Sequence, residues 1–157
     1  MDVKKHIISS LPLGTIYYSY SGDILLTSMA MASAVLVDID HCLDYVITQK
    51  RLASIKTMMD AFTGFKIVRK NYFVLHSWEL IFLLASYISL CPSPYLFACF
   101  TGYTLHVLLD QVYNGFFLRK YNLRIPFYFF IFRMRKNFDV TRLRRSNSFK
   151  IDEKGHE

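Results

Sequence analysis

YFVLHSWELIFLLASYISLCPSPYLFACFTGYTLHVLLDQVY, residues 72–113, decides the expected fold. Two apolar runs, Tyr72–Leu90 and Tyr95–Tyr113, stand on either side of Cys91–Pro94. Neither proline of that linker can donate a backbone hydrogen bond, so the linker predicts a break between two helices. Each run has about the 20 residues that a helix needs to cross the hydrocarbon of a bilayer. The stretch therefore predicts a helical hairpin embedded in a membrane.

The first part of the chain repeats this plan. His6–Tyr20 and Asp23–Val37 are apolar segments, and Ser21–Gly22 between them is a turn signal. The second segment is dense in Ala and Ser, small residues that let helices approach closely in lipid. We therefore expect an all-α integral membrane bundle with about four membrane-embedded helices in two hairpins, built as one domain over residues 1–140.

Three other segments are expected to lie outside the four long helices. Residues 46–71 place Ile55, Met58, Met59, Phe62 and Phe65 on one helical face, which indicates an amphipathic helix. This helix would lie on the bilayer surface or pack on a protein core. Pro126–Phe132 is too short to span, and is expected at the interface or against the bundle. Residues 141–157 are basic and polar, and are expected to be a disordered cytoplasmic tail.

The charge pattern favours a membrane over nucleic acid. The 157 residues are 53% hydrophobic and 17% aromatic, and their net charge is +7. Lys and Arg flank the apolar segments, as they do in the cytoplasmic loops of membrane proteins. We expect an inner- or plasma-membrane protein with both termini facing the cytoplasm. No zinc-finger spacing or aromatic RNA-binding signature is present, so a soluble helical DNA-binding protein is the weaker alternative and no nucleic acid is expected.

Ionisable residues interrupt both apolar runs of the second hairpin. His76 and Glu79 lie in its first run, and His106 and Asp110 in its second. Such groups cost a few kcal/mol each in a membrane segment unless they are paired or coordinated. At 1.5 Å per residue, His76 and Asp110 both lie about 24 Å from the proline turn, and His106 about 18 Å. The two helices should therefore bring His76 level with Asp110, while His106 and Asp110 share a helix face.

The first hairpin is expected to deliver more polar residues to the same level. If the basic start of the chain is cytoplasmic, His6 begins on that side, and the chain returns there after the turn with Asp38, Asp40 and His41. A single membrane histidine is more often a hydrogen-bonding residue than a metal ligand, and an acid near a helix end is usually solvated. Several such residues from separate helices at one depth favour a metal centre instead.

The sequence thus predicts one divalent metal site, with Zn²⁺ as the default ion for mixed imidazole and carboxylate ligands and Mn²⁺ or Fe²⁺ as alternatives. The expected ligands are Asp40, His41, His76, His106, Asp110 and His6. Glu79 or Asp38 is expected to accept a proton from a metal-bound water.

The order of these elements is similar to a known family. The series His6, Val37-Asp38-Ile39-Asp40-His41, Leu75-His76-Ser77 and Gly102-Tyr103-Thr104-Leu105-His106-Val107-Leu108-Leu109-Asp110 resembles the membrane-bound metal-dependent hydrolases of the YdjM-like type. That family is distantly similar to the zinc-dependent phospholipases C and single-strand nucleases. The resemblance implies metal-assisted phosphoester hydrolysis, with these histidines and aspartates as site residues. The chain departs from the soluble relatives: it has fewer histidines than their three-metal cluster needs, and Tyr72–Leu75 replaces an H-R-x-x-x element before His76.

We therefore expect a membrane-bound hydrolase that acts on a phosphoester or a lipid head group at the cytoplasmic face. Its basic loops would attract an anionic substrate. The alternative is a non-catalytic integral membrane protein, in which a structural metal or a buried His/Asp network holds the bundle together. In that alternative the basic tail would bind a partner or an anionic lipid.

Overall fold

The computed structural model describes residues 3–62, 69–117 and 125–147 of the chain, and the expected all-α fold is confirmed there. Its four principal helices are α1 (Val3–Ser21), α2 (Ile24–Leu36), α5 (Trp78–Leu90) and α6 (Pro94–Val112). The shorter helices are α3 (Ile39–Gln49), α4 (Ile55–Asp60), α7 (Phe130–Arg135) and α8 (Val140–Asn147). A π-helical turn, Tyr113–Phe117, follows α6, and a 3-10 turn, Ile125–Tyr128, precedes α7.

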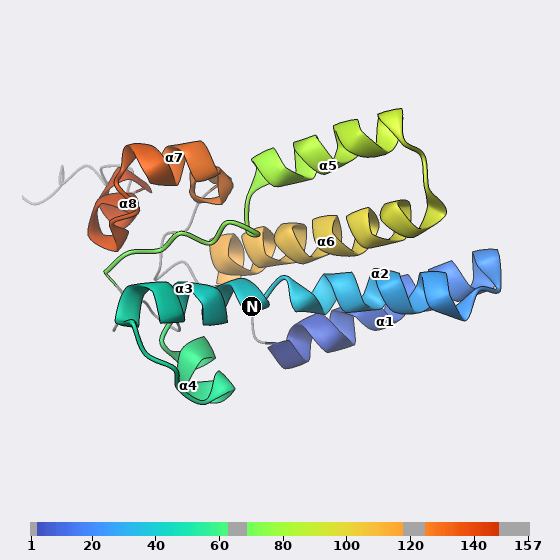
Figure 1. The fold of residues 1–157 in the computed structure, drawn as a ribbon, viewed down its shortest axis with the longest axis horizontal. Helices are drawn as coiled ribbons and strands as arrows, with labels where there is room; N and C mark the ends of the chain where they lie inside the picture. The colour runs from blue at the N-terminus through green and yellow to red at the C-terminus, as the bar shows by residue number, and fades with distance from the viewer. Residues whose placement is uncertain (1–2, 63–68, 118–124, 148–157) are drawn as a thin grey trace, which may run out of the picture.

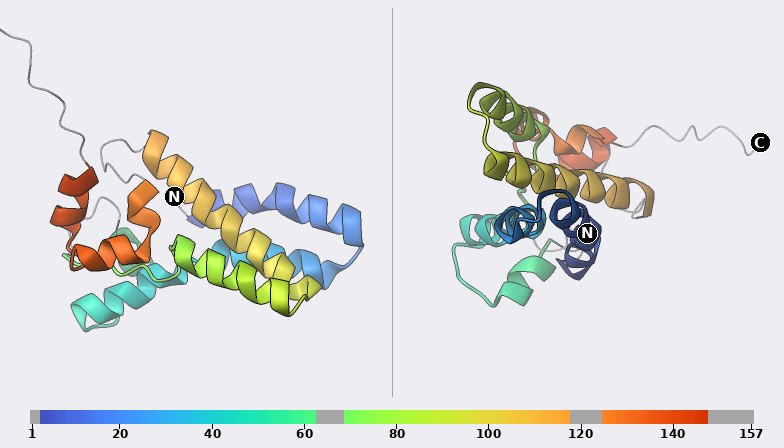
Figure 2. Two further views of the ribbon diagram at one scale, coloured as in Figure 1. Left: turned by 90° about the horizontal axis from the view of Figure 1, so that it is seen from above. Right: turned by 90° about the vertical axis from the view of Figure 1, so that its right-hand side faces the viewer.

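The four principal helices form two hairpins that point the same way (Figure 1). Gly22 makes the turn between α1 and α2 with a φ of 63°, and Asp23 caps α2 by accepting from two backbone amides. Ser93 caps α6 after the proline turn. Both turns lie at one end of the molecule, and α3, α4, α7 and α8 gather at the other, which we call the base (Figures 1 and 2). The polar ends of α1, α2 and α6 therefore meet at the base.

Close contact between α2 and α6 joins the two hairpins. Ala30 and Ala34 of α2 and Gly102 of α6 are buried. A Cβ atom at Gly102 would lie 2.0 Å from the carbonyl oxygen of Ala30 and 2.2 Å from Oγ of Ser33. Only glycine therefore fits at this crossing, as expected for small residues at a tight helix interface. The crossing sets the position of the following turn of α6 against the end of α2.

The second hairpin differs from its expected form, because the segment Tyr72–Leu90 is not one helix. Helix α5 begins only at Trp78 and has 13 residues. The amides of Tyr72 and Phe73 donate to the carboxylate of Asp44 at 2.7 and 3.0 Å, and the amide of Leu75 donates to Asp40 at 2.6 Å. Since these carboxylates satisfy the amides, the chain stays a loop over residues 70–77, and α5 is short of the length that spans a bilayer.

The number of membrane-length helices also differs from the expected four. Among the described residues, one stretch, Ile24–Gln49, is long and apolar enough to cross a membrane. This stretch combines α2 and α3 and lies near the N-terminus. A core helix of a soluble protein or a signal sequence meets the same criteria of length and hydropathy. Helices α1 and α6 have 19 residues each. They carry lysines or the polar residues of the site, which lowers their hydropathy below that of a typical span.

The segments at the base pack onto a protein core. Helix α4 covers only Ile55–Asp60 of the expected amphipathic helix, and Met58 and Phe62 are buried in the core cluster beside Phe73. Phe65 lies outside the described residues. In the segment Pro126–Phe132, Phe127 and Tyr128 are buried in the same core.

The segment expected to be a disordered tail begins inside a helix. Helix α8 runs from Val140 to Asn147, and Leu143 is buried in the core cluster. The first part of residues 141–157 is therefore helical and packed at the base, and residues 148–157 lie outside the described part of the chain.

Candidate metal centre

Imidazoles and carboxylates from both hairpins meet at the base. His6 lies in the first turns of α1, Asp38 between α2 and α3, and His41 in α3. The other members come from the second hairpin: His76 from the loop before α5, and His106 and Asp110 from α6. Five of the six side chains are buried, and His41 is partly exposed. The structure therefore brings together six of the eight residues that the sequence predicts for the site.

The centre of the cluster is a pair of imidazoles beside a carboxylate. The Nε2 atoms of His76 and His106 lie 3.2 Å apart. Oδ1 of Asp38 lies 3.7 Å from Nε2 of His76, 3.5 Å from Nε2 of His106 and 3.4 Å from Nε2 of His41. Three imidazole nitrogens thus surround one carboxylate oxygen at distances longer than a good hydrogen bond.

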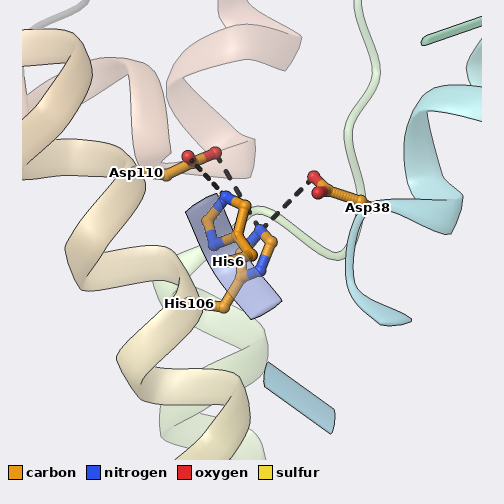
Figure 3. A group of neighbouring side chains, drawn as sticks. All are labelled: His6, Asp38, His106 and Asp110. Carbon is orange, nitrogen blue, oxygen red and sulfur yellow. Dashed lines mark hydrogen bonds and ion pairs between the residues drawn. The ribbon is translucent and has the colours of Figure 1, made fainter. Parts of the chain in front are cut away.

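A second carboxylate faces the same imidazoles from the opposite side. Oδ1 of Asp110 lies 3.1 Å from Nε2 of His6, and Oδ2 lies 3.5 Å from Nε2 of His76. The rings of His6 and His106 stack with centroids 3.8 Å apart. Figure 3 shows these two rings between the carboxylates of Asp38 and Asp110.

Outer contacts orient the two central imidazoles. Nδ1 of His106 lies 2.8 Å from the carbonyl oxygen of Ala34, which can only accept, so Nδ1 carries the proton. Nδ1 of His76 lies 3.4 Å from Oδ2 of Asp40. Such contacts are typical of metal-ligating histidines, because they turn the Nε2 lone pair toward the ion. The 3.2 Å separation of these two Nε2 atoms requires a proton or another cation beside them, because two facing lone pairs would repel.

The electrostatics of His76 point to the same need for positive charge. Burial disfavours its charged form, but the facing carboxylates of Asp110, Asp38 and Asp40 outweigh burial and hold the pKa of His76 well above its usual range. The surrounding carboxylates therefore bind a proton on this ring tightly. A divalent ion can replace that proton, since metal ligation requires the neutral imidazole.

Several buried polar atoms of the cluster lack a hydrogen-bond partner within the described residues. They are both carboxylate oxygens of Asp38 and the Nδ1 atoms of His6 and His41. Burial of a carboxylate without a counter-charge costs several kcal/mol, and a protonated His76, 3.7 Å from Oδ1 of Asp38, offsets part of this cost. A bound cation would remove that cost.

Two groups of side chains have ligand atoms close enough to hold an ion. The first is His6, Asp38, His106 and Asp110, and the second is Asp38, His41 and His76, with all ligand atoms of each group within 4.8 Å of one another. Bonds of about 2.0–2.1 Å in a tetrahedral site place ligand atoms about 3.3–3.4 Å apart. The separations of 3.1–3.7 Å quoted above are close to this value. The residues present thus fit a divalent metal ion.

Asp38 and Asp40 have different surroundings from those expected. Asp38, predicted as the proton acceptor, belongs to both ligand groups. Asp40, predicted as a ligand, belongs to neither group, and its Oδ2 accepts from the amides of Leu75 and His76 at 2.6 and 3.3 Å. Asp40 therefore stabilises the loop of residues 70–77 and orients the ring of His76.

Glu79, the other predicted proton acceptor, lies outside both ligand groups. Its two carboxylate oxygens accept from the backbone amides of Phe130 at 2.8 Å and Ile131 at 3.0 Å. These amides are at the start of α7, so the carboxylate caps that helix.

Two residues that the sequence did not single out as part of the site support it from outside. Arg133 is fully buried and donates to the carbonyl oxygens of His76 at 3.0 Å, Phe73 at 2.7 Å and Phe127 at 2.6 Å. Burial lowers the pKa of Arg133 to about 10, which leaves it charged at neutral pH. Asp44, buried four residues after Asp40, receives the amides at the start of the same loop. The four-residue spacing of Asp40 and Asp44 could have predicted that both face the same loop. Arg133 could not be predicted in this way, because it stands in a segment with several other basic residues.

Comparison with known proteins adds no relative: no family model, no curated protein and no solved structure matches this chain. The geometry of the site is therefore the basis for a functional proposal.

Proposed function

We propose that the protein is a membrane-bound, metal-dependent hydrolase that acts on a phosphoester or a lipid head group at the cytoplasmic face. The observation that carries the proposal is the facing pair of Nε2 atoms on His76 and His106, each with its Nδ1 engaged elsewhere, beside buried Asp38 and Asp110. Membership of the YdjM-like hydrolases, which the motif order suggests, is part of the same proposal.

The residues of the cluster suit metal-assisted hydrolysis. Asp38, Asp110 and the four imidazoles would supply the metal ligands, and Zn²⁺ is favoured by this mixture of ligands, with Mn²⁺ or Fe²⁺ as alternatives. A bound ion of this kind lowers the pKa of its water and polarises a phosphoryl or acyl oxygen. Asp40 and Arg133 keep His76 in place through the loop.

Exposed apolar side chains support the membrane part of the proposal. The outer faces of the principal helices expose Ile7, Ile8, Leu11 and Ile16 on α1, Ile24, Leu25 and Leu36 on α2, and Phe82, Leu83, Tyr87 and Leu90 on α5. Large apolar patches are rare on soluble monomers, so exposed apolar side chains on three principal helices favour contact with lipid.

The distribution of charge supports a cytoplasmic base. Exposed basic residues lie on the elements of the base, among them Lys4, Lys5, Lys50, Arg51, Arg135 and Arg142. The hairpin turns at the opposite end, residues 21–23 and 91–94, contain no Lys or Arg. By the positive-inside rule the base, and with it the site, would face the cytoplasm.

The test is elemental analysis of detergent-purified protein, combined with hydrolysis assays on phosphodiesters and phospholipid vesicles. We expect metal in at least a close to stoichiometric amount in the wild type and less metal in His106→Ala. His156→Ala is the matched control, because His156 is the one histidine of the sequence that is not among the predicted site residues. Wild-type protein that contains no metal would remove the proposal, and release from membranes by high salt without detergent would remove its membrane part.

A non-catalytic membrane protein with a structural metal is the second candidate. The observation in its favour is the complete burial of His6 and His106 beside Asp38 and Asp110, since structural zinc sites are closed by four protein ligands. This candidate expects Asp40→Asn and His106→Ala to lower thermal stability, with no hydrolysis of any ester by the wild type.

A further inference from the structure

We infer that the centre holds two metal ions that share Asp38: a closed ion with His6, His106 and Asp110, and an accessible ion with His41 and His76. The inference rests on the metal centre of the proposed function and specifies how many ions that centre binds and which residues hold each.

The first observation is that the two ligand groups overlap in one residue. Asp38 is the only member common to both groups among the described residues. It is 4% exposed, and neither of its oxygens makes a hydrogen bond there. Oδ1 has imidazole nitrogens of both groups, from His106 and from His41, at 3.5 and 3.4 Å. A carboxylate with both oxygens available is the usual bridge in two-metal hydrolases.

The second observation is that the four imidazoles form a row too long for one ion. His6 stacks on His106 at 3.8 Å, His106 meets His76 at 5.1 Å, and His76 meets His41 at 5.1 Å between ring centroids. The end members, His6 and His41, do not occur in one ligand group. One ion with bonds of about 2 Å therefore cannot bind both ends of the row, whereas two ions bind all four rings.

The third observation is that the two groups differ in exposure. The side chains of His6 and His106 are 0% exposed, and the side chain of His41 is 14% exposed. The first group offers four protein ligands, which closes a tetrahedral site, and Figure 3 shows His6 and His106 beside the carboxylates of Asp38 and Asp110. The second group offers three ligands and leaves a position for water, as in catalytic zinc sites. The ion near His41 would thus be the one that meets substrate.

The experiment counts ions in detergent-purified full-length protein by elemental analysis. We expect two ions per chain in the wild type and in His156→Ala, one in His41→Ala, one in His6→Ala, and none in Asp38→Ala. Far-UV circular dichroism shows whether each variant folds. Manganese-loaded wild type is also examined by electron paramagnetic resonance, where we expect spin coupling between two ions, and we expect the six-line signal of an isolated ion in His41→Ala.

The outcomes separate this inference from the proposed function. One ion per wild-type chain with hydrolysis intact overturns the inference alone, and so do two ions without spin coupling. Two coupled ions without hydrolysis support the inference and count against the hydrolase. Protein without any metal overturns both. Should Asp38→Ala fail to fold, the spin coupling of the wild type decides whether the two ions are adjacent.

Discussion

Replacing Asp40 by asparagine tests whether Asp40 orients the metal ligand His76 or is itself a metal ligand. Oδ2 of Asp40 accepts from the amide of Leu75 at 2.6 Å and the amide of His76 at 3.3 Å, and lies 3.4 Å from Nδ1 of the His76 ring. Asparagine has the same shape and keeps one acceptor oxygen, so the loop can keep its amide contacts. What the substitution removes is the negative charge that orients the imidazole and raises its basicity.

The size of the effect follows from these contacts. Loss of an outer partner of a metal-ligating histidine typically weakens metal binding by about 10–100-fold, which is about 1.4–2.7 kcal/mol. Two amide bonds change from charge-assisted to neutral, which costs about 1 kcal/mol each. A loss of about 2 kcal/mol lowers the Tm of a chain of this size by about 4–8 °C.

The assay is chelator competition, which gives the Kd of the metal, together with thermal unfolding in detergent. Asp44→Asn is the matched control, because Asp44 also accepts two loop amides, at 2.7 and 3.0 Å, but is in neither ligand group. We expect the two variants to lose similar stability. Metal affinity should fall only in Asp40→Asn, and should stay within about threefold of wild type in Asp44→Asn.

Two results would refute this reasoning. Unchanged metal affinity in Asp40→Asn would mean that its carboxylate does not orient His76 for an ion. Equal loss of affinity in both variants would mean that the effect comes from a disordered loop and not from the charge on one imidazole partner.

Three further changes test other parts of the structure. Arg133→Met removes three charge-assisted hydrogen bonds to buried carbonyl oxygens, and should destabilise the protein by about 3–6 kcal/mol in denaturant unfolding. Gly102→Ala forces α2 and α6 apart, so we expect a lower Tm and weaker metal binding. Gly22→Ala is its control, because Gly22 has open space around it and a φ of 63°. This substitution should cost about 1–2 kcal/mol of stability and leave metal binding unchanged. Glu79→Gln weakens the cap of α7 and should lower the free energy of unfolding by about 0.5–2 kcal/mol without loss of bound metal or of hydrolysis. Loss of hydrolysis with the metal retained would identify Glu79 as the proton acceptor.

The sequence by itself indicated that residues of the two hairpins would meet at one level. The proline linker at Cys91–Pro94 and the turn at Gly22 divide the apolar segments into hairpins, and a fixed rise per residue sets how far each polar group lies from its turn. That arithmetic placed His76 level with Asp110, and Nε2 of His76 lies 3.5 Å from Oδ2 of Asp110. Local chemistry and helix geometry suffice here, because each distance is measured along a single hairpin.

Tertiary structure decided the role of each residue. Residues 72–77 are apolar enough to continue α5, but they stay a loop because Asp40 and Asp44, about 30 positions earlier in the chain, accept their amides. The same contacts give Asp40 a different role from Asp38, which lies two residues before it. The sequence could not tell which of the two aspartates is a metal ligand and which one orients a ligand. Which amide, lone pair or carboxylate a side chain meets depends on how separate helices pack against one another, and no pattern along one segment contains that information.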